Sequence, residues 1–143
     1  MRSIFLASDH AGFTLKTKII SYLKENSINH IDLGCDSSEK SVDYPDYAHA
    51  LCQKFDEKEN IGILICGSGV GVSIAANRYP NIRAALCMGE EIAKLSRQHN
   101  DANVLCLGAR FLEEDKAITI IKTFLETSFE NGRHQIRVDK LSR

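Results

Sequence analysis

The chain of 143 residues is predicted to fold as a Rossmann-like three-layer α/β/α sandwich around a five-stranded parallel sheet. Short apolar segments alternate along it with segments of helical periodicity, which favours parallel strands joined by helices on both faces of the sheet. The segment IGILIC, residues 61–66, is apolar almost throughout and stops at a glycine, as a strand buried on both faces does. We find no linker, repeat or low-complexity segment, so residues 1–143 are expected to form one domain.

Each expected strand is a short apolar run that ends in glycine or in polar residues. The strands are expected at residues 3–7, 28–33, 61–66, 82–88 and 103–108. Between them, apolar residues recur with helical spacing. Helices are expected at residues 11–26, 45–59, 72–77 (ending before Pro80), 90–99 and 113–126, with a short final helix in a basic tail that begins at 128. Pro45 suits a first helical position, where its missing N–H costs nothing. Ile92, Ala93 and Leu95 are expected to face inward.

Composition excludes several classes of protein. A net charge of −1 gives no electrostatic reason to expect nucleic acid or an anionic membrane as a partner. No apolar run approaches the roughly 20 residues that a membrane helix needs. The start of the chain meets an acid at Asp9, too early for a signal peptide, so a cytoplasmic location is expected. Five cysteines without a CxxC pair indicate reduced thiols, not zinc ligands or disulfides.

Chemically useful side chains follow several of the expected strands. They are Ser8-Asp9-His10, Cys66 to Gly71, Met88-Gly89 and Gly108-Ala109-Arg110. In open parallel sheets, ligands bind beyond the carboxyl ends of the strands. An acid, an imidazole, a thiol and a guanidinium at one rim therefore indicate an active site.

The loop Gly67-Ser68-Gly69-Val70-Gly71 connects the third strand to a helix. It does not match the dinucleotide fingerprint, because Val72 stands where a third glycine is expected, and no lysine follows for a P-loop. Two interpretations remain: an anion cradle built from backbone N–H groups, or a tight turn that only needs small residues.

Cys66, at the end of the same strand, is either a small buried hydrophobe or a reactive thiolate stabilised by the neighbouring amides. As a thiolate it could act as a nucleophile or as a general base. The other four cysteines, at positions 35, 52, 87 and 106, are interpreted as structural.

A second group of polar residues is expected at the opposite rim. His99 and Asn100 lie between the fourth helix and the fifth strand, and the tail carries Arg133, His134 and Arg137. The two arginines are four residues apart and therefore share one helix face. They form either a solvated surface or a phosphate clamp. If this group serves the Cys66 site, a second subunit must supply it, which predicts a functional homodimer.

Seven segments together are similar to one known family. They are SDHAGFTLK (8–16), DYPDYA (43–48), ILICGSGVGVSIAANR (63–78), IRAALC (82–87), LSRQHNDANVL (95–105), GAR (108–110) and GRHQIRV (132–138). With them the chain resembles the ribose-5-phosphate isomerase B family, which includes the galactose-6-phosphate isomerase subunits. The resemblance implies a Rossmann-like enzyme without metal or cofactor. Such an enzyme interconverts D-ribose 5-phosphate and D-ribulose 5-phosphate in the non-oxidative pentose phosphate pathway.

The resemblance also implies roles for individual residues. Cys66 would move a proton between C1 and C2 through a cis-enediolate, and His99 would open the sugar ring as proton donor. The remaining roles would be sugar binding by Asp9, His10 and Asn100, phosphate binding by Arg110, Arg133 and Arg137, and enediolate stabilisation by Gly67, Ser68, Gly69, Val70 and Gly71. Val72 occupies the position of a glutamate base in another branch of the family, so the chain resembles the cysteine branch.

Two alternatives stay open at this point. The substrate could be a six-carbon sugar phosphate, galactose 6-phosphate or allose 6-phosphate, since nothing in the motifs fixes the size of the pocket. The chain could also be a non-catalytic phosphosugar-binding module. From the two separate rims we expect a homodimer, or a tetramer, with sites shared between subunits and with the tail from about 128 to 143 packed on a second subunit.

Overall fold

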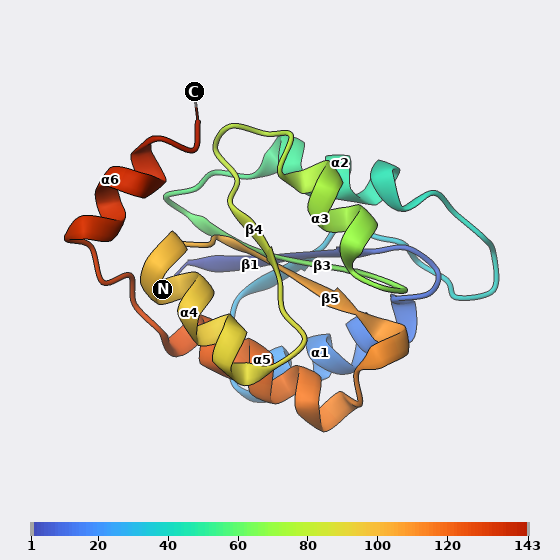
Figure 1. Ribbon diagram of the computed structural model, residues 1–143. Coiled ribbons are helices and arrows are strands. Elements are labelled where there is room, and N and C mark those ends of the chain that lie inside the picture. The colour runs from blue at the N-terminus through green and yellow to red at the C-terminus, as the bar shows by residue number, and fades with distance from the viewer. Residues whose placement is uncertain (1, 143) are drawn as a thin grey trace.

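The computed structural model describes residues 2–142 and confirms the predicted α/β/α architecture (Figure 1). Five parallel strands form one sheet in the order β2-β1-β3-β5-β4. The strands are β1 (Ser3–Ser8), β2 (His30–Asp32), β3 (Asn60–Cys66), β4 (Ala84–Leu86) and β5 (Val104–Gly108). β3 lies in the middle, and all seven of its residues are buried, which explains its nearly continuous apolar sequence.

Helices cover both faces of this sheet. They are α1 (Phe13–Glu25), α2 (Tyr44–Lys54), α3 (Val70–Ala76), α4 (Glu90–Asn100), the 3₁₀ turn η1 (Ala109–Phe111), α5 (Glu114–Glu126) and α6 (Arg133–Asp139). α2 and α3 pack on one face, and α1, α4 and α5 pack on the other (Figure 1). α6 stands at the side of the molecule near α4, and none of its seven described residues is buried.

The core is divided by the sheet into two layers. Alternate residues of β3 enter different layers: Ile63 packs with α1, α4 and α5, and Leu64 packs with α2 and α3. This alternation follows from the two-residue period of a strand. Both residues are fully buried, so the centre of β3 is held from both sides.

Several element boundaries differ from expectation, including those of α2, β4 and α3. α2 ends at Lys54, about five residues early, because Asp56 and Asn60 close a turn: the Asn60 N–H donates to the Asp56 carbonyl (2.8 Å), and the Asp56 N–H donates to Asn60 Oδ1 (2.8 Å). β4 is shorter than its apolar run because it is an edge strand, paired only with β5. α3 begins at Val70, inside the expected loop.

The prediction that Ile92 faces inward is wrong, since 53% of this residue is exposed. The inward face of α4 is formed by Ala93, Ser96 and Arg97 instead. Arg97 is buried because its guanidinium donates to the Ala102 carbonyl (2.5 Å), to Asp101 Oδ1 (3.0 Å) and to the Thr127 carbonyl (3.1 Å). These hydrogen bonds allow a charged side chain to be buried on the inward face of α4.

Within residues 2–142, no helix combines the length and the apolar character that crossing a membrane requires.

Candidate active site

The carboxyl ends of three neighbouring strands bring together part of the predicted site. In the sheet, Ser8 of β1 lies opposite Ile65 of β3, and Cys66 of β3 lies opposite Gly108 of β5. Asp9, Cys66 and Arg110 therefore start from adjacent positions on one rim of the sheet, as the sequence predicted. We call the residues at this end the thiol rim: Asp9, His10, Cys66, Gly67, Ser68, Gly69, Val70, Gly71 and Arg110.

Cys66 is buried at the base of the glycine loop. Its Sγ accepts the N–H of Gly69 at 3.2 Å, a contact that stabilises negative charge on the sulfur. Gly69 has φ +79°, and a Cβ there would come within 2.9 Å of the Leu107 carbonyl carbon, so this position requires glycine. The turn therefore aims a backbone N–H at the thiol.

The amides beyond Gly69 belong to the first turn of α3. The Val70 N–H donates to Ser68 Oγ at 3.2 Å, so this donor has a partner inside the loop. The Gly71 N–H follows it, in a part of the helix where N–H groups have no carbonyl one turn earlier to donate to. The loop thus presents Gly71 as a backbone donor for an external anion.

Arg110 lies directly over the start of the loop. Its backbone N–H donates to the Gly67 carbonyl at 3.0 Å. A Cβ at Gly67 would lie 2.9 Å from Arg110 Nη1, so the absence of a side chain at 67 is what lets the guanidinium lie there. This contact places a permanent positive charge over Gly67, the residue that follows Cys66.

Asp9 and His10 are held by backbone contacts. Asp9 Oδ1 accepts the Gly12 N–H at 3.1 Å, and the carboxylate is buried. His10 Nδ1 accepts the Val42 N–H at 3.1 Å, which leaves Nε2 as the protonated nitrogen of the neutral ring. His10 can therefore act as a hydrogen-bond donor at this rim.

Sequence reasoning gave no role to two residues that shape the thiol rim. The ring of Tyr44 covers Gly71 so closely that a Cβ there would lie 2.5 Å from Tyr44 Cε1. Lys16 is fully buried, and its Nζ donates to Asp32 Oδ1 and to the Cys35 carbonyl, both at 2.6 Å. Both residues fall within the motifs of the resemblance, but no local pattern indicates their contacts.

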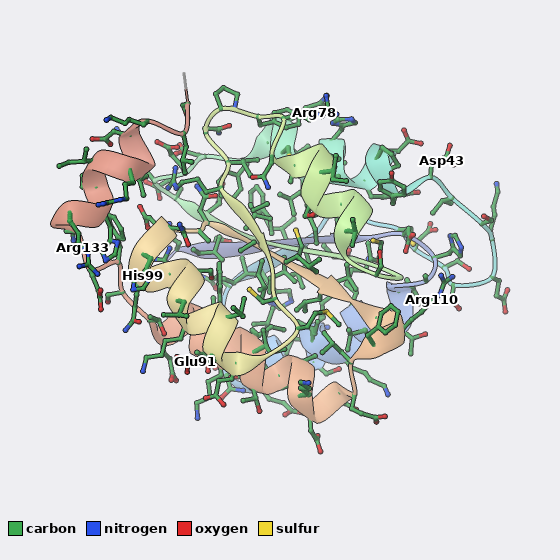
Figure 2. All side chains as sticks on the ribbon, in the orientation of Figure 1. Asp43, Arg78, Glu91, His99, Arg110 and Arg133 are labelled. Carbon is green, nitrogen blue, oxygen red and sulfur yellow. The ribbon has the colours of Figure 1, made fainter. Side chains whose placement is uncertain are left out.

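The other predicted site residues lie at the opposite end of the sheet. Figure 2 shows Arg110 at one end and His99 with Arg133 at the other. The rings of His99 and His134 stack, with centroids 4.3 Å apart and planes 12° apart. Glu130 Oε1 lies 3.8 Å from His99 Nε2 and 3.5 Å from His134 Nε2. We call His99, Asn100, Glu130, Arg133, His134 and Arg137 the imidazole cluster.

Asn100 and the two arginines of this cluster are exposed. Arg137 Nη1 donates to the Arg133 carbonyl at 2.9 Å, so the two side chains leave the same face of α6, as their spacing predicted. One copy of the chain does not bring the imidazole cluster to the thiol rim. Their assembly into one site stays a prediction.

Burial raises the pKa of three of the other thiols. It raises the pKa of Cys52 to about 12 and that of Cys87 to about 11, and it raises the pKa of Cys106 well above its ordinary value. In the imidazole cluster, the pKa of His134 is lowered by desolvation and by the neighbouring His99 and Arg133, while Glu130 acts in the opposite direction. All five cysteines are free thiols.

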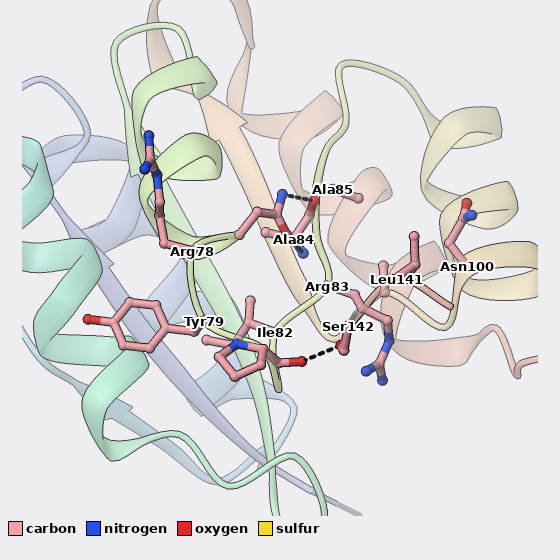
Figure 3. A pocket seen from close by; sticks show the side chains of 12 residues that line it. Arg78, Tyr79, Ile82, Arg83, Ala84, Ala85, Asn100, Leu141 and Ser142 are labelled. Carbon is pink, nitrogen blue, oxygen red and sulfur yellow. Dashed lines mark hydrogen bonds between the residues drawn. The ribbon is translucent and has the colours of Figure 1, made fainter. Parts of the chain in front are cut away.

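A hollow of about 710 Å³ lies along the open edge of the sheet, away from the thiol rim (Figure 3). Ile82, Ala84 and Ala85 line it from the β4 side, and Asn100 and Leu141 line it from the other. The Ser142 hydroxyl donates to the Pro80 carbonyl at 2.8 Å across it. The hollow connects the edge strand to the end of α4 and to the C-terminal tail.

Comparison with known proteins gives consistent matches over nearly the whole chain. The family model described as Ribose/Galactose Isomerase matches residues 4–141. A probable ribose-5-phosphate isomerase B of Mycoplasma genitalium is 47% identical, covering 99% of this chain and 94% of the relative. Ribose-5-phosphate isomerase B of Escherichia coli strain K12 is 46% identical, and the match covers 99% of this chain and 95% of that relative.

Solved structures agree with these relatives. Ribose 5-phosphate isomerase B of Anaplasma phagocytophilum is 50% identical with a TM-score of 0.94, and the match covers 99% of this chain and 97% of that one. The Mycoplasma genitalium enzyme, solved with bound ribulose-5-phosphate, is 47% identical with a TM-score of 0.93. The match covers 99% of this chain and 94% of that one.

Proposed function

This chain belongs to the ribose/galactose isomerase family, and on that premise we infer that it is an aldose–ketose isomerase interconverting D-ribose 5-phosphate and D-ribulose 5-phosphate. The observation that carries the inference is the nearly full-length match to ribose-5-phosphate isomerases B, one of them solved with ribulose-5-phosphate. The thiol rim supplies the groups that such a reaction uses.

Cys66 is the proposed base. Its thiolate takes the C2 proton of the open-chain aldose, and the C1 carbonyl oxygen becomes the oxyanion of a cis-enediolate. The proton of the C2 hydroxyl then passes to the oxygen on C1, and the resulting thiol returns its proton to C1, which leaves the carbonyl at C2. The hydrogen bond from the Gly69 N–H supports the thiolate form. The reaction moves only protons, so it uses neither a redox centre nor a covalent bond between Cys66 and the sugar.

The loop is the proposed oxyanion hole. The Gly71 N–H and the Ser68 hydroxyl are the donors that remain available to the enediolate, and a single donor of this kind contributes about 3–4 kcal/mol to the transition state. Arg110 above Gly67 offers its guanidinium to the phosphate. Asp9 and His10 supply an acceptor and a donor for sugar hydroxyls at the same rim.

The imidazole cluster is the proposed second half of the site, supplied by another copy in a homodimer. There His99 donates the proton that opens the furanose ring, Asn100 binds the sugar, and Arg133 and Arg137 bind phosphate. Three features support a dimer: the edge strand β4 is open, the 710 Å³ hollow lies beside it, and Ile136 and Leu141 of the tail are more than 60% exposed. In this proposal each chain is one domain and its tail packs on the partner.

The test of the isomerase assignment is Cys66→Ala. Loss of a general base is expected to lower kcat by about 100- to 10,000-fold, while binding of ribose 5-phosphate, measured by calorimetry, is retained. Cys52→Ala removes a different buried thiol and is expected to keep kcat. A wild-type protein that binds ribose 5-phosphate without isomerising it would instead support a binding module.

A six-carbon substrate is the second candidate, because the matching family model covers galactose as well as ribose isomerases. Comparing kcat/KM for ribose 5-phosphate, galactose 6-phosphate and allose 6-phosphate decides between them. We expect ribose 5-phosphate to have the highest kcat/KM.

We also propose a reducing, cytoplasmic location, which the five free thiols support.

A further inference from the structure

We propose that His99, Glu130 and His134 bind one divalent transition-metal ion of the zinc type, and that the bound ion inhibits the isomerase by occupying His99. The inhibitory half of this proposal rests on the proposed function of His99. Within residues 2–142, this is the only group of three ligating side chains whose donor atoms all lie within 4.8 Å of one another.

The donor atoms are those that zinc prefers. Zn²⁺ binds imidazole nitrogen and carboxylate oxygen at about 2.0–2.2 Å, so two ligands of one tetrahedral ion lie about 3.4 Å apart. The two contacts of Glu130 Oε1, 3.5 Å to His134 Nε2 and 3.8 Å to His99 Nε2, are already close to that separation. Three protein ligands would leave a fourth position for water.

The backbone holds the three residues together independently of their side chains. The Glu130 N–H donates to the Gln98 carbonyl at 3.0 Å, which ties the segment before α6 to α4, the helix that carries His99. The His134 N–H donates to the Asn131 carbonyl at 3.1 Å at the start of α6. A side-chain substitution at Glu130 therefore removes a ligand while leaving the frame in place.

The side chains have freedom to close around an ion. His99 and Glu130 are 39% and 50% exposed, whereas His134 is only 12% exposed. The lowered pKa of His134 favours its neutral ring, the form that binds a metal. Arg133 lies next to His134 and its charge opposes a cation, so we expect weaker binding than at a dedicated structural zinc site.

The binding experiment titrates ZnCl₂ into the wild-type protein by calorimetry in a phosphate-free buffer. We expect one ion per chain, with affinity at least about tenfold weaker in Glu130→Gln. Glu126→Gln makes the same charge change at an exposed glutamate outside the group and is expected to bind like the wild type. Cys66→Ala is expected to bind zinc too. Loss of binding in that variant would assign the ion to the thiol and overturn the site.

The inhibition experiment measures isomerase activity with and without zinc, and then after addition of EDTA. We expect reversible inhibition in the wild type and a higher zinc concentration for half-inhibition in Glu130→Gln. No saturable binding below millimolar zinc, or equal binding in Glu130→Gln, would overturn the metal site. Binding without inhibition would contradict the inhibitory role. A wild type that is inactive both without EDTA and with it would instead overturn the proposed function, and the calorimetry would still test the metal site.

Discussion

At the scale of single residues, Cys66 differs from three of the other cysteines in its surroundings. Cys66 receives a hydrogen bond from the loop, whereas burial raises the pKa of Cys52, Cys87 and Cys106. A raised pKa keeps a thiol protonated at neutral pH, and the thiolate is the reactive form. We therefore expect the same residue type to react at different rates at these positions.

This difference predicts selective alkylation. Iodoacetamide at pH 7.5 is expected to label Cys66 faster than Cys52, Cys87 and Cys106, and saturating ribose 5-phosphate is expected to slow the reaction at Cys66. Peptide mass spectrometry over a time course measures each rate. Equal labelling of all five cysteines would count against a reactive thiol at position 66.

His134 gives a second prediction, for pH. Its pKa is lowered from the ordinary value of about 6.5, so its ring is expected to take up a proton only at lower pH. Glu130 partly offsets this, since a carboxylate favours the imidazolium. In Glu130→Gln the pKa of His134 is therefore expected to fall further, as measured by NMR titration of the ring protons. A higher pKa in the variant would contradict the assigned contact.

At the residue scale, the sequence located features that have a local signal and did not indicate contacts between distant segments. Cys66 and its loop were found because an apolar run, a thiol and glycines are contiguous. Tyr44, Lys16 and Glu130 were missed because each acts on residues from another segment of the chain: Gly71, Asp32 and His99 respectively. No periodicity in one segment reports such contacts.

At the scale of elements, the strand–loop–helix unit of β3 and α3 depends on its glycines. Gly69 has positive φ and lies against both β4 and β5: a Cβ there would be 2.5 Å from Leu86 Cδ1 of β4 and 2.9 Å from a backbone carbon of Leu107 of β5. The loop that is proposed to present Gly71 to a ligand is therefore also packed into the sheet. A change in its packing is expected to affect its proposed function.

Gly69→Ala is expected to lower the free energy of unfolding by about 2 kcal/mol, from backbone strain and the clash together, and to lower kcat. Gly89→Ala is the control, because a Cβ at Gly89 meets nothing within 4 Å and its φ is negative. Gly89→Ala is expected to lower the free energy of unfolding by less than about 1 kcal/mol. Urea denaturation of both variants measures the difference, and equal losses would contradict this account of the loop.

The order and type of the elements followed from the sequence, but some ends and faces did not. The apolar spacing of α4 pointed Ile92 inward, yet the buried Arg97 takes the core side because carbonyls from other segments satisfy it. β4 ends early because an edge strand has one neighbour. These outcomes depend on the tertiary environment, which a local pattern does not contain.

At the scale of the whole molecule, the two halves of the proposed site lie at opposite rims of one sheet. The thiol rim follows the carboxyl ends of β1, β3 and β5, and His99 lies at the far end of α4. The sequence indicated this separation through chain order alone. It could not indicate the geometry of a second copy, since residues at an interface resemble other exposed residues until the partner is present.

The central claim, that two copies of the chain complete each other's active site, is tested most directly by mixing two inactive variants. Cys66→Ala and His99→Ala are combined under conditions of subunit exchange, and heterodimer formation is checked with two affinity tags. Half of the dimers are then mixed and each carries one intact site, so we expect roughly a quarter of wild-type activity to return. Verified heterodimers that stay inactive would contradict the shared site.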